Sequence, residues 1–257
     1  MSFPFNDILK LPTRCLLSKR LPKTFFQRNF DLTASEKKVL NAIISVEWLA
    51  SIKPNNSNIA AFADATTTFE EIQVITCLLP ASDCETLAGD ASTLIQKNIP
   101  YHVLAIVESD SEFVVSTSEK RINQNDSRRR TIASYQLSPT VSKLYKTEAS
   151  EAFFTGLSFT TLDKTNLKTS YESYAHAIVQ LQVAMATGIT TQRSRTRSAE
   201  DMELLQKLDA LEVELLRLGN QIKKETQLNK KVSLNVEIQT KRKQIENIKK
   251  QLITDGY

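Results

Sequence analysis

Hydrophobic and polar residues follow three rhythms along the chain, and each rhythm predicts a different part of the structure. The first is helical and opens in LTASEKKVLNAIISVEWLA, where Thr33 and Glu36 are spaced as in a capping box. Its apolar face consists of Leu40, Ile43, Ile44 and Leu49. We therefore expect a helix over the whole of this segment, ended by the turn-forming stretch KPNNSN.

The second rhythm consists of short apolar runs rich in β-branched residues, which are typical of strands. FEEIQVITCLL (69–79) and YHVLAIVES (101–109) are separated by a helical pattern over residues 83–98. This order predicts a parallel pair of strands joined by a right-handed crossover. The dipeptide DS then separates the second run from EFVVSTS, which predicts an antiparallel hairpin, and RRTIASYQL is expected to form an edge strand.

The third rhythm alternates steps of four and three residues, as in long amphipathic helices. It first occurs at Leu167, Tyr171, Tyr174, Ile178, Leu181 and Met185, and Gly188 is the natural end of that helix. The chain thus divides into an N-terminal basic arm (1–32), a body (33–188), a basic linker (189–197) and a C-terminal segment (198–257). For the body we predict an α/β fold, a mixed sheet packed by helices, with an α+β arrangement as the alternative.

The C-terminal segment repeats the same rhythm twice, which predicts two helical seams of the coiled-coil type. The seams are Leu204, Leu208, Leu211, Leu215, Leu218 and Ile222, then Leu234, Ile238, Lys241, Ile245, Ile248 and Leu252. Twelve positions separate Ile222 from Leu234, so one straight helix would turn the second seam about 120° from the first. We therefore expect an antiparallel hairpin that turns at Leu228 and Asn229, because asparagine tolerates the left-handed conformation. A continuous helix that crosses a second copy, giving a homodimer, is the alternative.

The composition is that of a globular protein, with 257 residues, 41% hydrophobic and 24% charged. Three cysteines, an odd number without close pairing, fit a reducing cytoplasm better than secretion. No apolar run approaches the roughly 18 to 20 residues that a membrane-spanning helix needs. We therefore expect a cytoplasmic protein without a membrane partner.

The net charge of +4 is unevenly distributed. Between Arg217 and Lys250 there are ten Lys or Arg and three Glu, so this segment carries +7 and the remainder −3. Basic and amide side chains gather at two places where they could contact phosphates or a partner protein. They are Lys120, Arg121, Arg128, Arg129 and Arg130 at a predicted loop, and Lys223, Lys224, Asn229, Lys230, Lys231 and Asn235 at the hairpin tip. A solvated loop and a merely solubilising tip remain the alternatives.

The best enzymatic interpretation is a metal-dependent nuclease, because an acidic residue followed by E-x-K on paired strands is a Mg²⁺-binding pattern. Asp64, Glu71 and Gln73 imitate it, but Gln73 lacks the charge of the lysine. The simpler interpretation is a strand that begins with solvent-facing Glu70 and Glu71. No cysteine or histidine spacing indicates zinc, and no glycine-rich turn indicates a nucleotide. We therefore predict no catalytic residue, no metal and no cofactor.

Several stretches resemble a bacterial family known as domain of unknown function 4391. They are LPTRCLLSKRLPK, EEIQV, IPYHVLAIVES, the KR of SEKRIN, LDKTNLKTSYES and KKETQLNKKVSLNVEIQ, in the expected order along nearly the whole chain. The last stretch, with its two asparagines and paired lysines, is the most distinctive. The resemblance implies an accessory protein encoded beside helicases and DNA methyltransferases in restriction-type, anti-phage gene clusters, and it implies no activity. On this basis we expect a non-catalytic subunit that docks on a helicase or methyltransferase, or contacts DNA, with a homodimeric scaffold as a further alternative.

Overall fold

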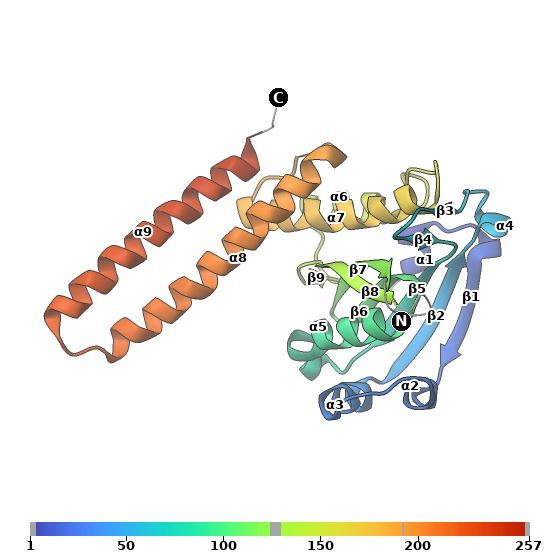
Figure 1. Cartoon of the computed structure of the whole chain (residues 1–257), viewed down its shortest axis with the longest axis horizontal. Helices are drawn as coiled ribbons and strands as arrows, with labels where there is room; N and C mark the ends of the chain where they lie inside the picture. Colours follow the sequence, from blue (N-terminus) through green and yellow to red (C-terminus); the bar gives the residue numbers. More distant parts are fainter. Residues whose placement is uncertain (1–3, 124–129, 192, 255–257) are drawn as a thin grey trace. The chain divides into compact units, whose positions relative to one another are not determined.

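The computed structural model describes residues 4–123, 130–191 and 193–254. The chain forms two compact units, Met1–Leu181 and Gln182–Tyr257 (Figure 1). The division falls inside helix α7 (Leu167–Thr187), a few residues before the predicted boundary at residue 188. The helix itself ends as predicted, because Gly188 adopts a φ of +74°, which a residue without a Cβ does at no steric cost.

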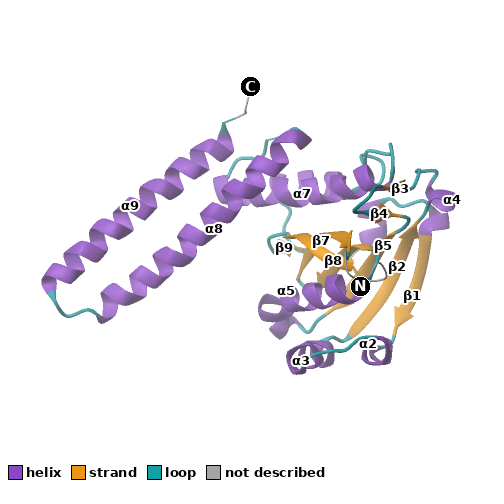
Figure 2. Ribbon diagram, in the orientation of Figure 1, coloured by secondary structure: helices purple, strands orange, loops and turns teal. Residues whose placement is uncertain are grey.

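The first unit is built around a mixed sheet, which confirms the predicted α/β class (Figure 2). Among the described residues, seven strands contribute to it in the order β1-β2-β5-β6-β7-β8, with β9 paired to β7. They are β1 (Leu16–Leu21), β2 (Ser45–Ile52), β5 (Ile72–Leu78), β6 (His102–Glu108), β7 (Glu112–Ile122), β8 (Arg130–Leu137) and β9 (Val141–Ser142). A separate two-stranded ladder joins β3 (Phe62–Ala63) to β4 (Thr68–Phe69).

The centre of the sheet has the predicted connections. Strands β5 and β6 are parallel, with Ile75 opposite Ala105, and helix α5 (Ala81–Asn98) joins them. Strands β6 and β7 form the predicted antiparallel hairpin, and β8 lies at the end of the strand order. The prediction of β5 and β6 is correct because both runs are short, rich in β-branched residues and bounded by turn-forming residues, as expected of strands that are buried along nearly their whole length.

The first predicted helix is correct at its start and wrong at its end. Thr33 caps α3 (Ala34–Ala42) by accepting a hydrogen bond from the Glu36 N–H, while the Glu36 carboxylate accepts one from the Thr33 N–H. However, α3 ends at Ala42, and the residues after Ile44 form strand β2. Burial of the strand against both neighbours outweighs the helical spacing of Leu49 from the apolar residues of α3, since β propensity depends on such packing.

The predicted N-terminal arm is part of the first unit rather than a separate segment. It contains α1 (Phe5–Leu9), the 3₁₀ turn η1 (Thr13–Cys15), strand β1 and α2 (Lys23–Asn29). Strand β1 pairs antiparallel with β2, and Leu9, Cys15 and Phe26 are fully buried. Lys19, Arg20 and Arg28 of this segment are therefore exposed on the edge strand and α2.

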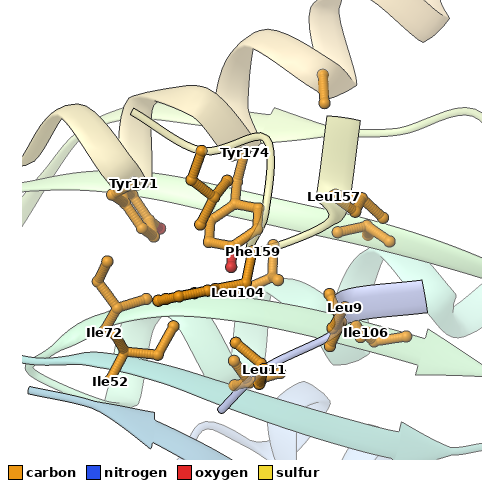
Figure 3. Packing of buried hydrophobic residues seen from close by; sticks show 14 of the residues in the cluster. Leu9, Leu11, Ile52, Ile72, Leu104, Ile106, Leu157, Phe159, Tyr171 and Tyr174 are labelled. Atoms are coloured by element: carbon orange, nitrogen blue, oxygen red, sulfur yellow. The ribbon is translucent and has the colours of Figure 1, made fainter. Parts of the chain in front are cut away.

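Two hydrophobic cores lie on opposite faces of the sheet, because successive residues of a strand point to opposite sides. On one face, Ile72 and Leu104 pack with Tyr171 and Tyr174 of α7, and with residues of α1 and α6 (Glu148–Leu157) (Figure 3). On the other face, the core is formed with α2, α3 and α5, and its strand residues are Val46, Ile75, Cys77, Val103, Ala105 and Val107. Each fully buried aliphatic or aromatic side chain contributes about 1.5–3 kcal/mol.

The second unit contains the predicted antiparallel helical hairpin. Helices α8 (Arg195–Lys224) and α9 (Leu228–Ile253) are about 45 and 39 Å long at 1.5 Å per residue. The Lys241 ammonium lies 2.8 Å from the Glu214 carboxylate, and the Arg197 guanidinium donates to the Gln251 carbonyl at 2.9 Å. Of the seam residues, Leu208, Leu218, Ile238 and Leu252 are buried. The alternative of one continuous helix is wrong, because the chain turns between the two helices.

The predicted turn was placed a few residues too late. The interhelical segment is Glu225–Gln227, and both Leu228 and Asn229 belong to α9. Glu225 and Gln227 are extended, with φ of −75° and −81°, so no left-handed residue is needed. Helix α8 begins at Arg195, three residues before the predicted start of the C-terminal segment at residue 198.

Within the described part of the chain, no helix is long and apolar enough to cross a membrane. Cys15, Cys77 and Cys84 are buried free thiols.

Candidate functional site

The three residues that imitate a nuclease pattern serve the internal structure of the body. Asp64 lies in the connection between β3 and β4, where its carboxylate accepts hydrogen bonds from the N–H groups of Thr66 and Thr67 at 2.7 and 2.8 Å. These hydrogen bonds lower the pKa of Asp64 to about 2. Asp64 is therefore a turn-forming carboxylate.

Glu71 is buried, in contrast to the predicted solvent-facing position at the start of the strand. Its carboxylate lies 3.1 Å from the Lys53 ammonium and accepts hydrogen bonds from the Ser51 hydroxyl at 2.7 Å and the Gln73 amide at 3.2 Å. Three donors thus use this carboxylate internally. Among the described residues, no group of three or more His, Cys, Asp or Glu side chains is arranged to hold a metal ion. The arrangement favours a structural role for Glu71 and Gln73.

The described residues of the first predicted basic cluster, Lys120, Arg121 and Arg130, do not form one surface. Lys120 is only 2% exposed, so its prediction as a phosphate-binding residue is wrong. Arg121 is exposed and lies 3.2 Å from the Glu119 carboxylate. Arg130 begins β8, where its guanidinium lies 3.4 Å from the Thr68 hydroxyl. Arg128 and Arg129 lie outside the described residues.

Lys120 is buried because it continues the inward-facing positions of β7. Its ammonium donates hydrogen bonds to the carbonyls of Ile99 and Tyr101 at 2.5 and 2.6 Å. Ile99 directly follows the last turn of α5, so Lys120 satisfies carbonyls at the negative end of that helix. Burial lowers the pKa of Lys120 to about 7.

His102 lies next to this lysine and is also part of the core. Its Nε2 accepts a hydrogen bond from the Lys120 N–H at 3.4 Å, and its ring stacks on Phe69 at a centroid distance of 3.6 Å. Burial, aided by the charges of Lys120 and Arg130, lowers the pKa of His102 to about 3. His102 is therefore neutral near pH 7 and serves packing.

The second predicted cluster lies together at the tip of the hairpin. Lys223 and Lys224 end α8, and Lys230 and Lys231 lie near the start of α9. A turn of three residues joins the two helices (Figure 1). Lys223, Lys224 and Lys230 are exposed and Lys231 is half-buried. Asn229 is exposed beside them, and its carbonyl accepts a hydrogen bond from the Ser233 hydroxyl at 3.3 Å. The hairpin thus brings the predicted tip residues to one end of the second unit.

The electrostatics of the tip favour a bound anion. Lys223 and Lys224 follow the usual preference for cations at a helix C-terminus, whereas Lys230 and Lys231 lie near the positive end of α9, where like charge is unfavourable. No acidic residue lies in the first turn of α9. The nine residues 223–231 contain four lysines and one glutamate, a net charge of +3.

Glu225 is the acidic residue of the tip, and the turn uses its carboxylate. One oxygen accepts hydrogen bonds from the N–H groups of Thr226 and Gln227, both at 2.9 Å. The hydrogen bond from Gln227, with smaller effects of Thr226 and the nearby Lys230 and Lys231, lowers the pKa of Glu225. Glu225 therefore stays ionised and fixes the turn while offsetting one of the four positive charges.

A hollow of about 470 Å³ lies between the ends of the two helices. It is lined by Gln221, Lys224, Glu225, Lys230, Ser233 and Leu234. Lys224 and Lys230 are predicted site residues and Leu234 is a predicted seam residue, whereas the sequence pattern does not single out Gln221, Glu225 or Ser233. The lining offers two ammonium groups, an amide and a hydroxyl that could bind a phosphate, beside the carboxylate of Glu225 and the apolar side chain of Leu234. Asn235 lies outside this hollow and lines a second one of about 420 Å³ on α9.

A family model matches most of the chain. Curated proteins and solved structures gave no match. A family described as a domain of unknown function (DUF4391) matches residues 9–245 of the 257-residue chain, which include the sheet, α8 and the hairpin tip. Because the match covers nearly the whole chain, the protein belongs to the family of the domain of unknown function DUF4391.

Proposed function

We propose that this protein is a non-catalytic accessory subunit of a restriction-type anti-phage defence complex, and that its hairpin tip holds DNA phosphates. The observation that supports the DNA contact is the convergence of four lysines on one exposed turn, beside a single glutamate that the turn itself uses. Membership of a defence complex is supported by the gene neighbourhood that the resemblance to the family implies. A helicase or DNA methyltransferase subunit is the partner in this proposal.

The chemistry of the tip suits positioning rather than sequence reading. Lysine ammonium groups bind phosphate as point charges, whereas base recognition needs planar, bidentate donors in a groove. The tip presents lysines, and an arginine is not among residues 219–241. The hairpin would therefore anchor the complex on duplex DNA without choosing its sequence.

Charge reversal at the tip tests the DNA contact. The variant K223E/K224E/K230E/K231E changes the net charge from +4 to −4. A matched control, K207E/R242E/K243E/K250E, makes the same change at exposed hairpin positions outside the tip. We expect the tip variant to lose at least about tenfold in affinity for duplex DNA at low salt, and the control to lose much less. Equal losses in the two variants would contradict a tip-centred site.

Incubation of the protein with duplex DNA and a divalent metal ion distinguishes the proposed function from the nuclease alternative. With Mg²⁺ or Mn²⁺ present, the proposal predicts that labelled duplex DNA stays intact. Cleavage by the wild-type chain that disappears in Glu71→Ala would replace the proposal with an enzymatic function, because Glu71 is the buried carboxylate of the imitated motif.

A further inference from the structure

Helix α9 exposes an apolar stripe close to the tip. Leu228, Val232 and Val236 are 74%, 55% and 63% exposed. Residues four positions apart lie above one another on a helix, so the three side chains cover one face over about 12 Å. Large exposed apolar groups in contiguous order commonly mark an interaction surface.

The packing of the hairpin does not account for this stripe. The residues that α9 turns toward α8 include Ile238, which is buried, and Leu234, which is half-buried. The stripe lies two positions earlier than each of these residues, about 200° around the helix. It therefore faces away from α8.

The surroundings of the stripe indicate the chemistry of that molecule. Val232 and Val236 line the second hollow with Asn235, Gln239, Thr240 and Lys243, so uncharged hydrogen-bonding groups border the apolar side chains and a lysine closes one end. Helix α9 as a whole contains seven basic and two acidic residues, a net charge of +5. A second copy of α9 would bring like charges together, whereas an acidic partner would be attracted.

We infer that this stripe docks an amphipathic helix of the partner subunit, one with aliphatic residues on one face and acidic residues beside them. The apolar residues of the partner helix would fill the hollow between Val232 and Val236, and its carboxylates would face Lys243 and the lysines of the tip. This inference rests on the proposed function, for which it names the chemistry of the partner.

A synthetic peptide tests the inference with the full-length protein. The probe is a fluorescent helical peptide with leucines at steps of four and three residues and glutamates beside them, and its binding is followed by anisotropy. The variant L228Q/V232Q/V236Q removes the stripe with a residue of good helix propensity. A matched control, V213Q/L216Q, removes exposed apolar residues of α8.

We expect saturable binding of the peptide that weakens at least about tenfold in the stripe variant and at most about twofold in the α8 control. A peptide with lysines in place of the glutamates should bind more weakly than the acidic one. Equal binding of the peptide to wild type and stripe variant would overturn the inference. So would wild-type self-association in light scattering that the stripe variant abolishes, because a second copy would then be the occupant.

The DNA contact can fail independently of this inference. The stripe variant keeps all four tip lysines, so its affinity for duplex DNA should equal that of the wild type. If the wild-type protein binds the peptide but not DNA, the phosphate contact is wrong and the docking surface stands. If it binds DNA but the stripe variant binds the peptide unchanged, the docking surface is wrong and the phosphate contact stands.

Discussion

Lys120 in the sheet body and the lysines at the hairpin tip differ in their exposure to solvent. Lys120 of the body is 2% exposed and both its recorded acceptors are backbone carbonyls, whereas Lys223, Lys224 and Lys230 of the hairpin lie in solvent. The sequence around each contains adjacent basic residues, KR in one case and KK in the other. Local charge density therefore does not decide whether a lysine is exposed, and the position of the residue in its secondary structure does.

The difference teaches which lysines are available for binding. Along β7, Ser116, Ser118 and Lys120 occupy alternate positions and share the side that faces α5, where Ser116 and Ser118 bond Gln96. At the hairpin tip, α8 ends and α9 begins on either side of a short turn, and the side chains of Lys223, Lys224 and Lys230 are exposed. Substitutions in the two regions should accordingly affect stability in the first and binding in the second.

The largest expected loss of stability tests whether the second unit, like the first, depends on a buried charged residue. Near the start of α8, the Arg193 guanidinium lies 2.6 Å from the buried Asp201 carboxylate, and Arg197 lies 3.3 Å from the same oxygen. Asp201→Ala should lower the free energy of unfolding by about 3–4 kcal/mol, because it leaves buried positive charge uncompensated. Denaturant unfolding followed by circular dichroism measures this loss.

The exposed neighbour provides the control for Asp201. Glu200 is 68% exposed in its side chain and contacts Arg197 at 3.0 Å. Glu200→Ala should change the stability by about 0.5 kcal/mol or less. A loss for Asp201→Ala no larger than this would show that the buried pair contributes nothing.

A somewhat smaller loss is expected for Lys120→Ala. This substitution removes the donors of two buried carbonyls and the packing of the side chain stem, at a cost of about 3 kcal/mol. Lys120→Met restores most of the volume and should cost about 1–2 kcal/mol. Arg121→Ala, on the exposed face of the same strand, should be nearly neutral. DNA affinity should be unchanged in all three variants, and a loss of affinity in Lys120→Ala alone would return this lysine to the binding site.

The pH dependence of the free energy of unfolding provides a second test of the burial of Lys120. Burial lowers the pKa of Lys120 to about 7 from a usual value of 10.5, so below pH 7 the residue is charged in both the folded and unfolded chain. Between pH 7 and 10.5 the unfolded chain binds more protons, and the contribution of Lys120 to the free energy of unfolding therefore rises with pH. Comparison with Lys120→Met over this window should show a smaller rise in the variant. Parallel curves would contradict the lowered pKa.

The smallest expected effect concerns the capping box of α3. The hydrogen bond from Lys97, with those from Thr33, lowers the pKa of Glu36 to about 2 from a usual value of 4.5. The contribution of the ionised Glu36 carboxylate to the free energy of unfolding is complete above pH 4.5 and is lost as the pH falls toward 2. Glu36→Gln should cost about 1 kcal/mol or less at pH 7 and flatten the acid limb of the stability curve. The pH profile of thermal unfolding is the readout, and an unchanged acid limb would exclude the capping carboxylate as its cause.

The sequence predicts local structure well where one rhythm dominates. The capping box of α3, the β5–α5–β6 crossover, the end of α7 at Gly188 and the helical hairpin are all correct. The prediction for β2 is wrong because Leu49 also fits the helical spacing that begins in α3, and long-range pairing with β1 and β5 decides the outcome. The turn is misplaced by a few residues because Glu225, rather than an asparagine, fixes it through its carboxylate.

The predictions for the candidate site residues are likewise correct where a local sequence pattern determines the position and wrong where distant segments determine it. The tip lysines come together because the hairpin places both helix ends at one turn, which the two seams already indicate. The burial of Lys120 had one signal, the alternation of Val114, Ser116, Ser118 and Lys120 along the strand, which continues past the apolar part of β7. The internal use of Glu71 depends on Ser51 and Lys53 of a neighbouring segment, so it has no local signal.

The salt dependence of DNA binding tests the central claim most directly. If the four tip lysines contact phosphates of duplex DNA, log K should fall with log salt with a slope of about −3.6, and affinity should drop roughly 100-fold between 50 and 200 mM. In K223E/K224E/K230E/K231E the slope should approach zero, while K207E/R242E/K243E/K250E should keep most of it. A wild-type affinity that is insensitive to salt, or a slope that the tip variant retains, would contradict a phosphate-binding tip.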